Sequence, residues 1–340
     1  MSPEISIIIL TVFAGAAQGV FTFLVAGDLL GLIKGSPLDG KVMIAGAMVS
    51  FLLTLVGIGS SFFHLTHPER GIKAIRRWQS SWLSLEAILM PVFMAFVGLY
   101  GLCAYFGAPP GLRVATGLLG VGTSFALYLA SGMLYAACRY IKEWNTPYTP
   151  INFTIIGLAT GGVVWTGTLE AIGAPHSITL SVIRVAFLLT VIGVVLKLAY
   201  YRRNRRLYNS FNIQSALGIN HPEIKLMDMG TSYQHYNTKE YDYRGFANKR
   251  GRIRRISLAL LFGSPIILLT LDYMPHLKGS PGVLGLIAAI SMMAGALMER
   301  WLFFVDGSHA QNLYYGSFKD AGAANPILQS AKKGAQLPPV

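Results

Sequence analysis

The sequence is poor in charged residues, which make up 13% of its 340 residues, whereas hydrophobic residues make up 53%. A soluble domain carries about 25% charged residues, so this chain lacks the polar groups needed to cover a water-exposed surface. Its net charge of +13 therefore does not indicate nucleic-acid binding, which needs a basic face on a soluble fold. Glycines spread through long apolar runs favour helices that pack closely in lipid. We predict an all-α, polytopic integral membrane protein.

Cysteine is also scarce. The sequence has two, Cys103 and Cys138, which lie inside apolar runs and outside any CxxC motif. This excludes a disulfide framework, an iron–sulfur cluster and a zinc site within the chain. The histidines fall in predicted loops or near the ends of predicted spans, and His64 and His67 do not face each other across two helices. We therefore expect neither haem nor another metal site in this chain.

Long apolar runs dominate the sequence, and eight of them are close to the roughly 20 residues that cross a bilayer. Lipid cannot satisfy exposed backbone groups, so each run is predicted to be a helix. The eight predicted transmembrane helices are Ile5–Gly27, Val42–Phe63, Leu83–Phe106, Leu112–Cys138, Ile151–Ile172, Ile178–Tyr201, Ile256–Met274 and Val283–Val305. They form one membrane domain over residues 1–316, and residues 317–340 are predicted to be a flexible tail.

Basic residues are distributed unequally between the two sets of loops. The loops that follow the second, fourth and sixth spans, with the C-terminal end counted from Arg300, hold 22 Lys and Arg. The other loops, with Arg113 at the start of the fourth span, hold 4. The positive-inside rule then places both termini of this multi-pass protein in the cytoplasm. The long polar stretch Arg202–Arg255 is predicted to be a cytoplasmic loop. Its aromatic segment Gly230–Tyr243 either rests on anionic lipid between basic flanks or docks a partner, and we favour docking.

Polar residues intrude on the helices between the second and third predicted spans. His64 ends the second span, and Glu86 lies about one turn into the third. An ionisable residue inside a membrane helix is costly and indicates a functional site. Histidine titrates near neutrality, and an apolar site favours the protonated form of a carboxyl group, so the pair could hydrogen-bond and exchange protons with the two oxygens of a quinone. In the alternative, Glu86 caps its helix and His64 is an interfacial residue.

Other intramembrane polar residues have competing interpretations. Gln18 could reach the same head group, or it could form a hydrogen bond between helices beside small residues. Glu170 and Arg184 are interpreted as a buried structural pair rather than a proton path. Asp272 and Glu299, near the ends of the last two spans, are interpreted as snorkelling or capping groups rather than proton relays.

The stretch around His64 and Glu86 resembles a known family. His64–Arg70 (HLTHPER) followed by Ser81–Glu86 (SWLSLE) is similar to the HLGxPxR…SWLSRE pattern of the dimethyl sulfoxide reductase membrane anchors. Further similarity lies at Met133–Ala137, at Glu143–Phe153 and at Gly157–Ala159, and it covers nearly the whole chain. Thr66 and Leu85 depart from the pattern, in place of Gly and Arg, and the lost Arg could change how the head group is held.

The resemblance implies a prokaryotic cytoplasmic-membrane subunit that anchors a molybdopterin catalytic subunit and an iron–sulfur subunit and contributes the quinone site. It implies eight helices, ubiquinone or menaquinone as cofactor, and His64 and Glu86 as the functional pair, His64 bonding one quinone oxygen and Glu86 carrying protons. Other residues are expected to shape the site: Gln18, Arg70, Arg77, Ser81 and Trp82.

Within the family, the long polar loop and the WNTPxTPxNF stretch resemble the anchor of the cytoplasmic sulfite dehydrogenase, which implies sulfite oxidation coupled to quinone reduction. The alternatives are a menaquinol-oxidising anchor of a dimethyl sulfoxide reductase-type complex, a secondary transporter, and a structural anchor without a quinone site. A transporter is disfavoured because the polar cluster lies at one membrane face rather than at the midplane.

Overall fold

The computed structural model describes residues 4–64, 73, 75–210, 217–221, 249–274 and 283–309. Over these ranges every regular element is helical, as predicted, and each of the eight predicted spans falls on a helix. The elements are α1 (Ile5–Ile33), α2 (Gly40–Ser61), η1 (Phe62–His64), η3 (Ile75–Arg77), α4 (Trp82–Tyr105), α5 (Pro110–Ala136), α6 (Tyr148–Ala171), α7 (His176–Ser210), α10 (Arg250–Leu258), η5 (Ala259–Gly263), α11 (Ser264–Tyr273) and α12 (Val283–Asp306). Helices α10 and α11 are continuous through η5, a single π-helical segment.

Seven helices among the described residues are long and apolar enough to cross a membrane, with Arg250–Tyr273 counted as one. The remaining long helix, α6, has 24 residues but carries five threonines and four glycines. Its composition suits its position, because α1, α5, α7 and α12 pack around it and shield it from lipid. Several of its threonine hydroxyls donate to backbone carbonyls one turn earlier, for example Thr160 to Ile156, which satisfies these hydroxyls within the helix.

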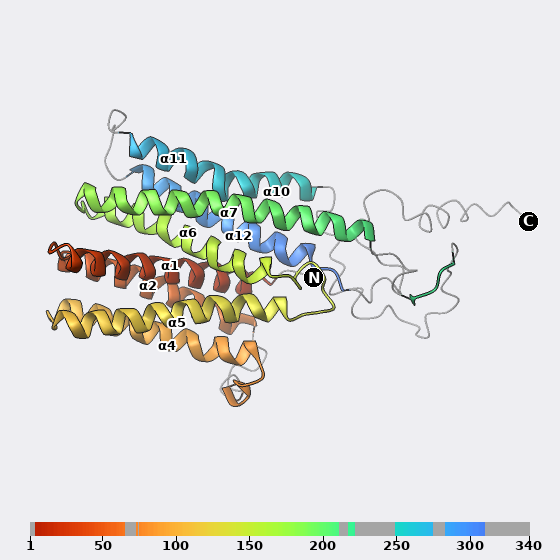
Figure 1. Cartoon of the computed structure of the whole chain (residues 1–340), viewed down its shortest axis with the longest axis horizontal. Helices are drawn as coiled ribbons and strands as arrows, with labels where there is room; N and C mark the ends of the chain where they lie inside the picture. Colours follow the sequence, from red (N-terminus) through yellow and green to blue (C-terminus); the bar gives the residue numbers. More distant parts are fainter. Residues whose placement is uncertain are drawn as a thin grey trace, which may run out of the picture.

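The long helices run side by side, alternating in direction, as one elongated bundle (Figure 1). The start of α1, the connection from α2 to α4 and the end of α12 lie at one end of the bundle. We call this the basic end, because it gathers most of the described Lys and Arg residues, among them Arg77, Arg139 and Arg203. The unequal distribution of Lys and Arg that the sequence predicts between the two sets of loops is therefore found between the two ends of the bundle.

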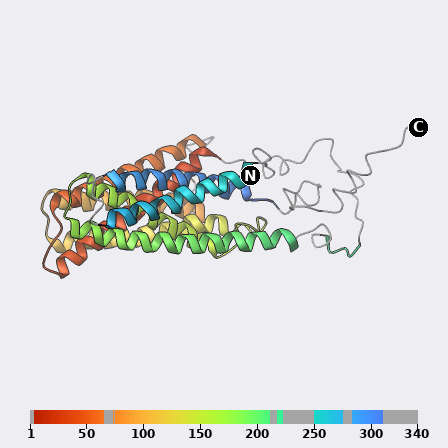
Figure 2. The ribbon, with the colours of Figure 1, turned by 90° about the horizontal axis from the view of Figure 1, so that it is seen from above.

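Two helices extend beyond the apolar runs that predicted them. Helix α7 continues nine residues past Tyr201, and α10 begins at Arg250, six residues before the predicted span. Both ends of the stretch Arg202–Arg255, which we predict to be a structured loop or a partner-docking segment, are therefore helical. With 35 residues, α7 is about 52 Å long, well over a bilayer core, so its polar end projects past the other helices (Figure 2). Residues 230–243 and 317–340 lie outside the described part of the chain.

At the opposite end of the bundle, a buried ion pair ties three helices together. Arg113 of α5 donates from Nε and Nη2 to the two carboxylate oxygens of Asp28 in α1, each at 2.9 Å. The Tyr100 hydroxyl of α4 donates to the same carboxylate at 2.9 Å. Because this pairing compensates the charge of Asp28, α1 continues past Gly27, where the apolar run ends, to Ile33.

In the middle of the bundle α1 and α6 approach at backbone distance. A Cβ built at Gly161 would lie 2.4 Å from the Cα of Gly19, so the crossing leaves no room for a side chain. Close approach through small residues is typical of helices that associate in lipid. The crossing brings Gln18, next to Gly19, into the interior, where it is 2% exposed.

Candidate functional site

The described residues between α2 and α4 lie at the basic end, and some of them present basic and aromatic side chains to the outside. Helix α2 ends at Ser61 and η1 closes at His64; Arg77 and Trp78 are exposed at the end of η3. Helix α4 then begins at Trp82, with Ser81 as its N-cap residue, whose side chain accepts from the Ser84 N–H at 3.3 Å. Since Ser81 caps α4, the alternative in which Glu86 is the capping residue is wrong.

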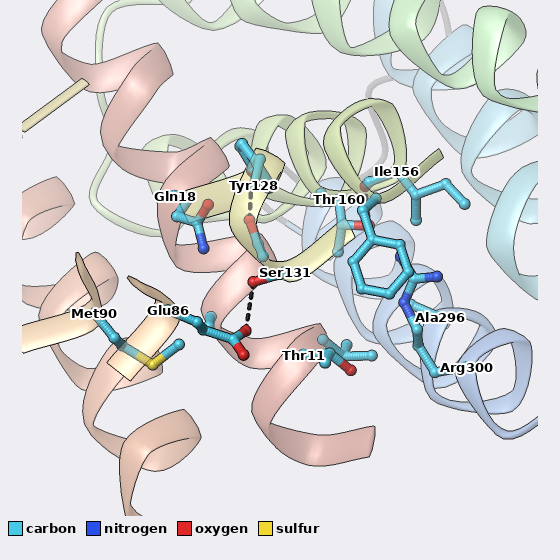
Figure 3. Close-up of a pocket in the computed structure, with 15 residues that line it drawn as sticks. Thr11, Gln18, Glu86, Met90, Tyr128, Ser131, Ile156, Thr160, Ala296 and Arg300 are labelled. Atoms are coloured by element: carbon cyan, nitrogen blue, oxygen red, sulfur yellow. Dashed lines mark hydrogen bonds between the residues drawn. The ribbon is translucent and has the colours of Figure 1, made fainter. Parts of the chain in front are cut away.

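Glu86 points into the bundle from the first turns of α4. The Ser131 hydroxyl of α5 donates to Glu86 Oε1 at 2.5 Å (Figure 3). The Glu86 side chain is half-buried, so part of its surface stays accessible while the carboxyl group faces the interior. A carboxyl group held by a neutral hydroxyl, with no cation of the described residues bonded to it, can take up and release a proton.

Beside Glu86 lies a small enclosed cavity of about 20 Å³. Its polar lining comes from five helices, α1, α4, α5, α6 and α12. The polar lining residues are Thr11, Gln18, Glu86, Tyr128, Ser131, Thr160 and Arg300 (Figure 3). Most of the hydroxyls are satisfied; Tyr128, for example, donates to the Gly15 carbonyl at 2.7 Å. The amide oxygen of Gln18, Oε1, is buried and has no hydrogen-bond partner in the part of the chain that the structure describes.

Arg300 connects this cavity to a buried ion cluster between α7 and α12. Its Nη1 lies 3.1 Å from Oε2 of Glu299, and the other carboxylate oxygen of Glu299 is bound by Nζ of Lys197. All three residues are at most 4% exposed. The Lys197 ammonium also lies 4.5 Å from the ring centre of Tyr200, within cation–π range. Two cations and one anion thus share a site from which bulk water is excluded.

An aromatic cluster at the basic end fixes the position of Arg300. The Arg300 guanidinium carbon lies 3.7 Å from the ring centre of Phe153. Around this pair, Tyr135, Trp144 and Phe303 pack edge to face or stacked, and the indole N–H of Trp144 donates to the Phe303 carbonyl at 2.9 Å. Large aromatic side chains in such contacts rigidify their surroundings, so Arg300 is held at the cavity wall.

Of the residues predicted from sequence, the structure brings Gln18 and Glu86 together at the cavity. It places Ser81 at the helix cap, Trp82 half-buried in the first turn of α4, and Arg77 on the exposed connector. His64 ends η1 at the same end of the bundle as Glu86. Arg70 lies outside the described residues.

Sequence reasoning missed the partners that complete the site. Ser131 lies in an apolar run and carries no signal of its own, whereas Glu299 and Arg300 are adjacent charges inside an apolar run and could have been recognised as an intramembrane site. The interpretation of Glu299 as a snorkelling or capping group was wrong, because it is fully buried against Lys197.

The interpretation of Glu170 and Arg184 as a pair was also wrong. Glu170 Oε2 accepts from the Gly285 N–H at 3.0 Å, and Arg184 donates to the Tyr273 hydroxyl at 3.3 Å. Both contacts link helices at the end of the bundle opposite the basic end.

The fold and the site define an integral membrane protein: a bundle of apolar helices with a carboxyl group, a polar cavity and an ion cluster buried near one end. The family model described as the DMSO reductase anchor subunit (DmsC) matches residues 1–316, and the chain belongs to this family. It is thus a membrane-anchor subunit, and the transporter alternative finds no support.

Two relatives refine this placement. The chain is 36% identical to a sulfite dehydrogenase subunit from Allochromatium vinosum over 329 residues, which cover 93% of this chain and 99% of the relative. It is 27% identical to the anaerobic dimethyl sulfoxide reductase chain YnfH of Escherichia coli over 194 residues, which cover 55% of this chain and 66% of the relative.

Proposed function

We propose that this anchor subunit exchanges electrons between an iron–sulfur partner subunit and the quinone pool of a prokaryotic cytoplasmic membrane, with His64 and Glu86 at the quinone site. The observation that carries the proposal is the placement of Glu86. Glu86 is a half-buried residue one turn from the start of α4, and its carboxyl group is bonded only to a neutral hydroxyl among the described contacts. A group in that position can pass protons to and from a ligand at the basic end.

The size of the cavity supports a quinone position on one side of Glu86. About 20 Å³ accommodates a single water molecule and is far too small for a six-membered ring. We therefore place the head group on the outer side of Glu86, towards His64, the exposed connector that carries Arg77, and Trp82. Quinone supplies two-electron, two-proton chemistry when bound, and the residues fit it: Glu86 holds the proton, His64 offers an imidazole hydrogen bond, and Arg77 contributes positive charge.

Helix number and orientation follow from the same arrangement. We propose that α6 crosses the membrane as the eighth span, because its 24 residues are long enough and its neighbours shield its polar groups. The basic end then faces the cytoplasm with both termini. Protons exchanged at Glu86 come from and return to that side, so turnover is electroneutral.

The projecting end of α7 provides a docking surface for partner subunits. Arg203 donates to the carbonyls of Lys142 and Asn145, which attaches the start of this projection to the α5–α6 connection. The connection and the projection therefore form one continuous surface at the basic end. We propose that an iron–sulfur subunit binds there, with residues 202–255 taking part, and that it links the anchor to a molybdopterin catalytic subunit.

Sulfite is the proposed soluble substrate of the complex, with electrons flowing to quinone. The support is the match to the sulfite dehydrogenase subunit, which extends over nearly the whole of both chains, whereas the match to the dimethyl sulfoxide reductase chain covers 55% of this one. The purified complex should reduce quinone with sulfite. Oxidation of quinol by dimethyl sulfoxide in place of that activity would favour the reductase alternative.

The role of His64 is tested by His64→Ala in the intact complex. Loss of one hydrogen bond to the head group, worth about 1 kcal/mol net, should raise KM for quinone about five-fold, and more if the imidazole is charged. Activity with a soluble dye that takes electrons directly from the clusters should not change. The control is His176→Ala, the same substitution at the opposite end of the bundle. Equal KM values for the two variants would mean that His64 does not bind the quinone.

A further inference from the structure

The exposed face of α7 changes from apolar to basic near the basic end of the bundle. Leu188, Val195 and Leu198 are each at least 50% exposed and lie at helical spacing on one side of this helix. The same spacing leads on to Arg202 and Arg205, which are also exposed. A helix face that contacts lipid over much of its length therefore ends in two arginines.

Helix α10 repeats this arrangement in the opposite chain direction. Arg252 and Arg255 are exposed, and the exposed Ile256 and Ala259 follow four positions after each of them, on the same side of the helix. The exposed face that begins with two arginines thus continues as an apolar face. We call the four residues Arg202, Arg205, Arg252 and Arg255 the outward arginines.

Two neighbouring arginines of the same helices are engaged within the protein. Arg254 of α10 donates to Asp306 of α12 at 2.9 Å, and its guanidinium carbon lies 4.7 Å from the ring centre of Tyr201 in α7, so α7 and α10 are in contact here. Arg203 donates to two carbonyls of the α5–α6 connection. The outward arginines, in contrast, have no partner among the residues that the structure describes. Their guanidinium groups are free to bind a ligand outside the bundle.

The spacing of the outward arginines favours an anion as that ligand. Two arginines three positions apart are neighbours on a helix surface, and their like charges repel each other. A phosphate between them removes the repulsion, because it accepts paired hydrogen bonds from guanidinium groups. A phospholipid places its phosphate at the border where its acyl chains end. A free phosphate ion would use the arginines alone, whereas a lipid also uses the apolar face that continues from them.

We infer that the outward arginines bind the head groups of anionic phospholipids, one pair on α7 and one pair on α10. The acyl chains lie along the exposed apolar faces of the same helices, and the bound phosphates hold both helices at a fixed depth in the bilayer. This inference goes beyond the proposed function, since it needs only that the bundle spans a membrane and does not depend on a quinone at Glu86. The side of the α7 projection that carries Arg203 remains available to the iron–sulfur subunit.

The test measures lipid binding to the purified complex in detergent. The anionic probe is fluorescently labelled phosphatidylglycerol, and the neutral probe is phosphatidylcholine with the same label. When all four outward arginines are changed to glutamine, the affinity for phosphatidylglycerol should fall about 25-fold, at about five-fold for each of the two arginines in a site. The affinity for phosphatidylcholine should change little. Glutamine is a good helix former, so α7 and α10 are retained in this variant. Changing either pair alone should remove half of the tight sites.

The control combines Arg76→Gln with Arg139→Gln, which removes as much charge as one pair does. Both residues are exposed, and they lie on the connections between helices rather than at the end of an apolar helix face. This control should keep its affinity for phosphatidylglycerol. An equal loss in the control overturns the inference, because net charge alone would then attract the lipid.

Three further outcomes would also overturn the inference. The first is an unchanged affinity for phosphatidylglycerol in the four-arginine variant. The second is displacement of the probe by inorganic phosphate as effectively as by unlabelled phosphatidylglycerol, which would make the ligand a free anion. The third is a four-arginine variant that loses the iron–sulfur subunit but keeps its lipid affinity, which would assign the outward arginines to protein docking.

Discussion

A complex carrying Glu86→Gln should assemble normally, keep its activity with a soluble dye, and lose quinone-linked turnover by a factor of about 10²–10⁴. The amide has nearly the size of the carboxyl group and can still accept the hydrogen bond from Ser131, so the packing around the cavity is retained. It cannot take up or release a proton, and general acid–base catalysis at the head group is lost. Steady-state assays with quinone and with dye, on the same preparation, measure the quinone-linked turnover and the dye-linked activity.

A matched control for this variant lies at the other end of the bundle. Glu170→Gln makes the same chemical change at a carboxyl group that accepts from the Gly285 N–H, a bond that an amide oxygen also accepts. It should leave both activities unchanged. If Glu86→Gln behaves like this control, the quinone site lies elsewhere. If Glu86→Gln abolishes assembly and dye activity as well, its role is structural.

The second large effect is expected on stability. Glu299→Gln leaves Lys197 and Arg300 buried without their shared counter-ion, and breaking a buried ion pair from one side costs about 3–5 kcal/mol. The anchor subunit in the purified complex should therefore unfold at a temperature several degrees lower than in the natural protein. The yield of assembled complex should also drop. Thermal unfolding in detergent, followed for this variant and a reference variant at one scan rate, provides the comparison.

The reference for that experiment is Asp39→Asn. Asp39 is exposed and caps α2 by accepting from the Lys41 N–H, and Asn caps about as well, so its effect should stay within about 0.5 kcal/mol. Equal stability of the two variants would mean that Glu299 does not hold the cluster together. It would also remove the physical reason for treating Arg300 as fixed in position at the cavity.

The helices were predictable from sequence because lipid imposes one rule on every span: a long apolar run must be helical. That rule stops applying at the ends of the bundle. The end of α7 and the start of α10 are too polar to be recognised by hydropathy. Helix α1 passes Gly27 because Asp28 is paired with Arg113, 85 positions away in the sequence. A pairing between such distant residues is decided by the packing of helices, which spacing along the chain does not reveal.

The site, like the helices, could be predicted only in part. Glu86 and Gln18 stood out as polar residues in apolar runs, and the cavity contains both. Their partners did not stand out, because Ser131 lies on α5, and Lys197 and Glu299 are 102 positions apart. An intramembrane charge signals that a partner exists, but only the arrangement of the helices shows which one it is.

The most direct measurement is a cofactor-resolved map of the intact complex with quinone bound. We predict a quinone head group between His64 and Glu86, outside the small cavity, with the iron–sulfur subunit bound to the basic end beside the projecting part of α7. A head group bound elsewhere in the bundle would contradict the proposed site. An iron–sulfur subunit on the end that carries the α1–α2 connection would contradict the orientation and the path of the electrons.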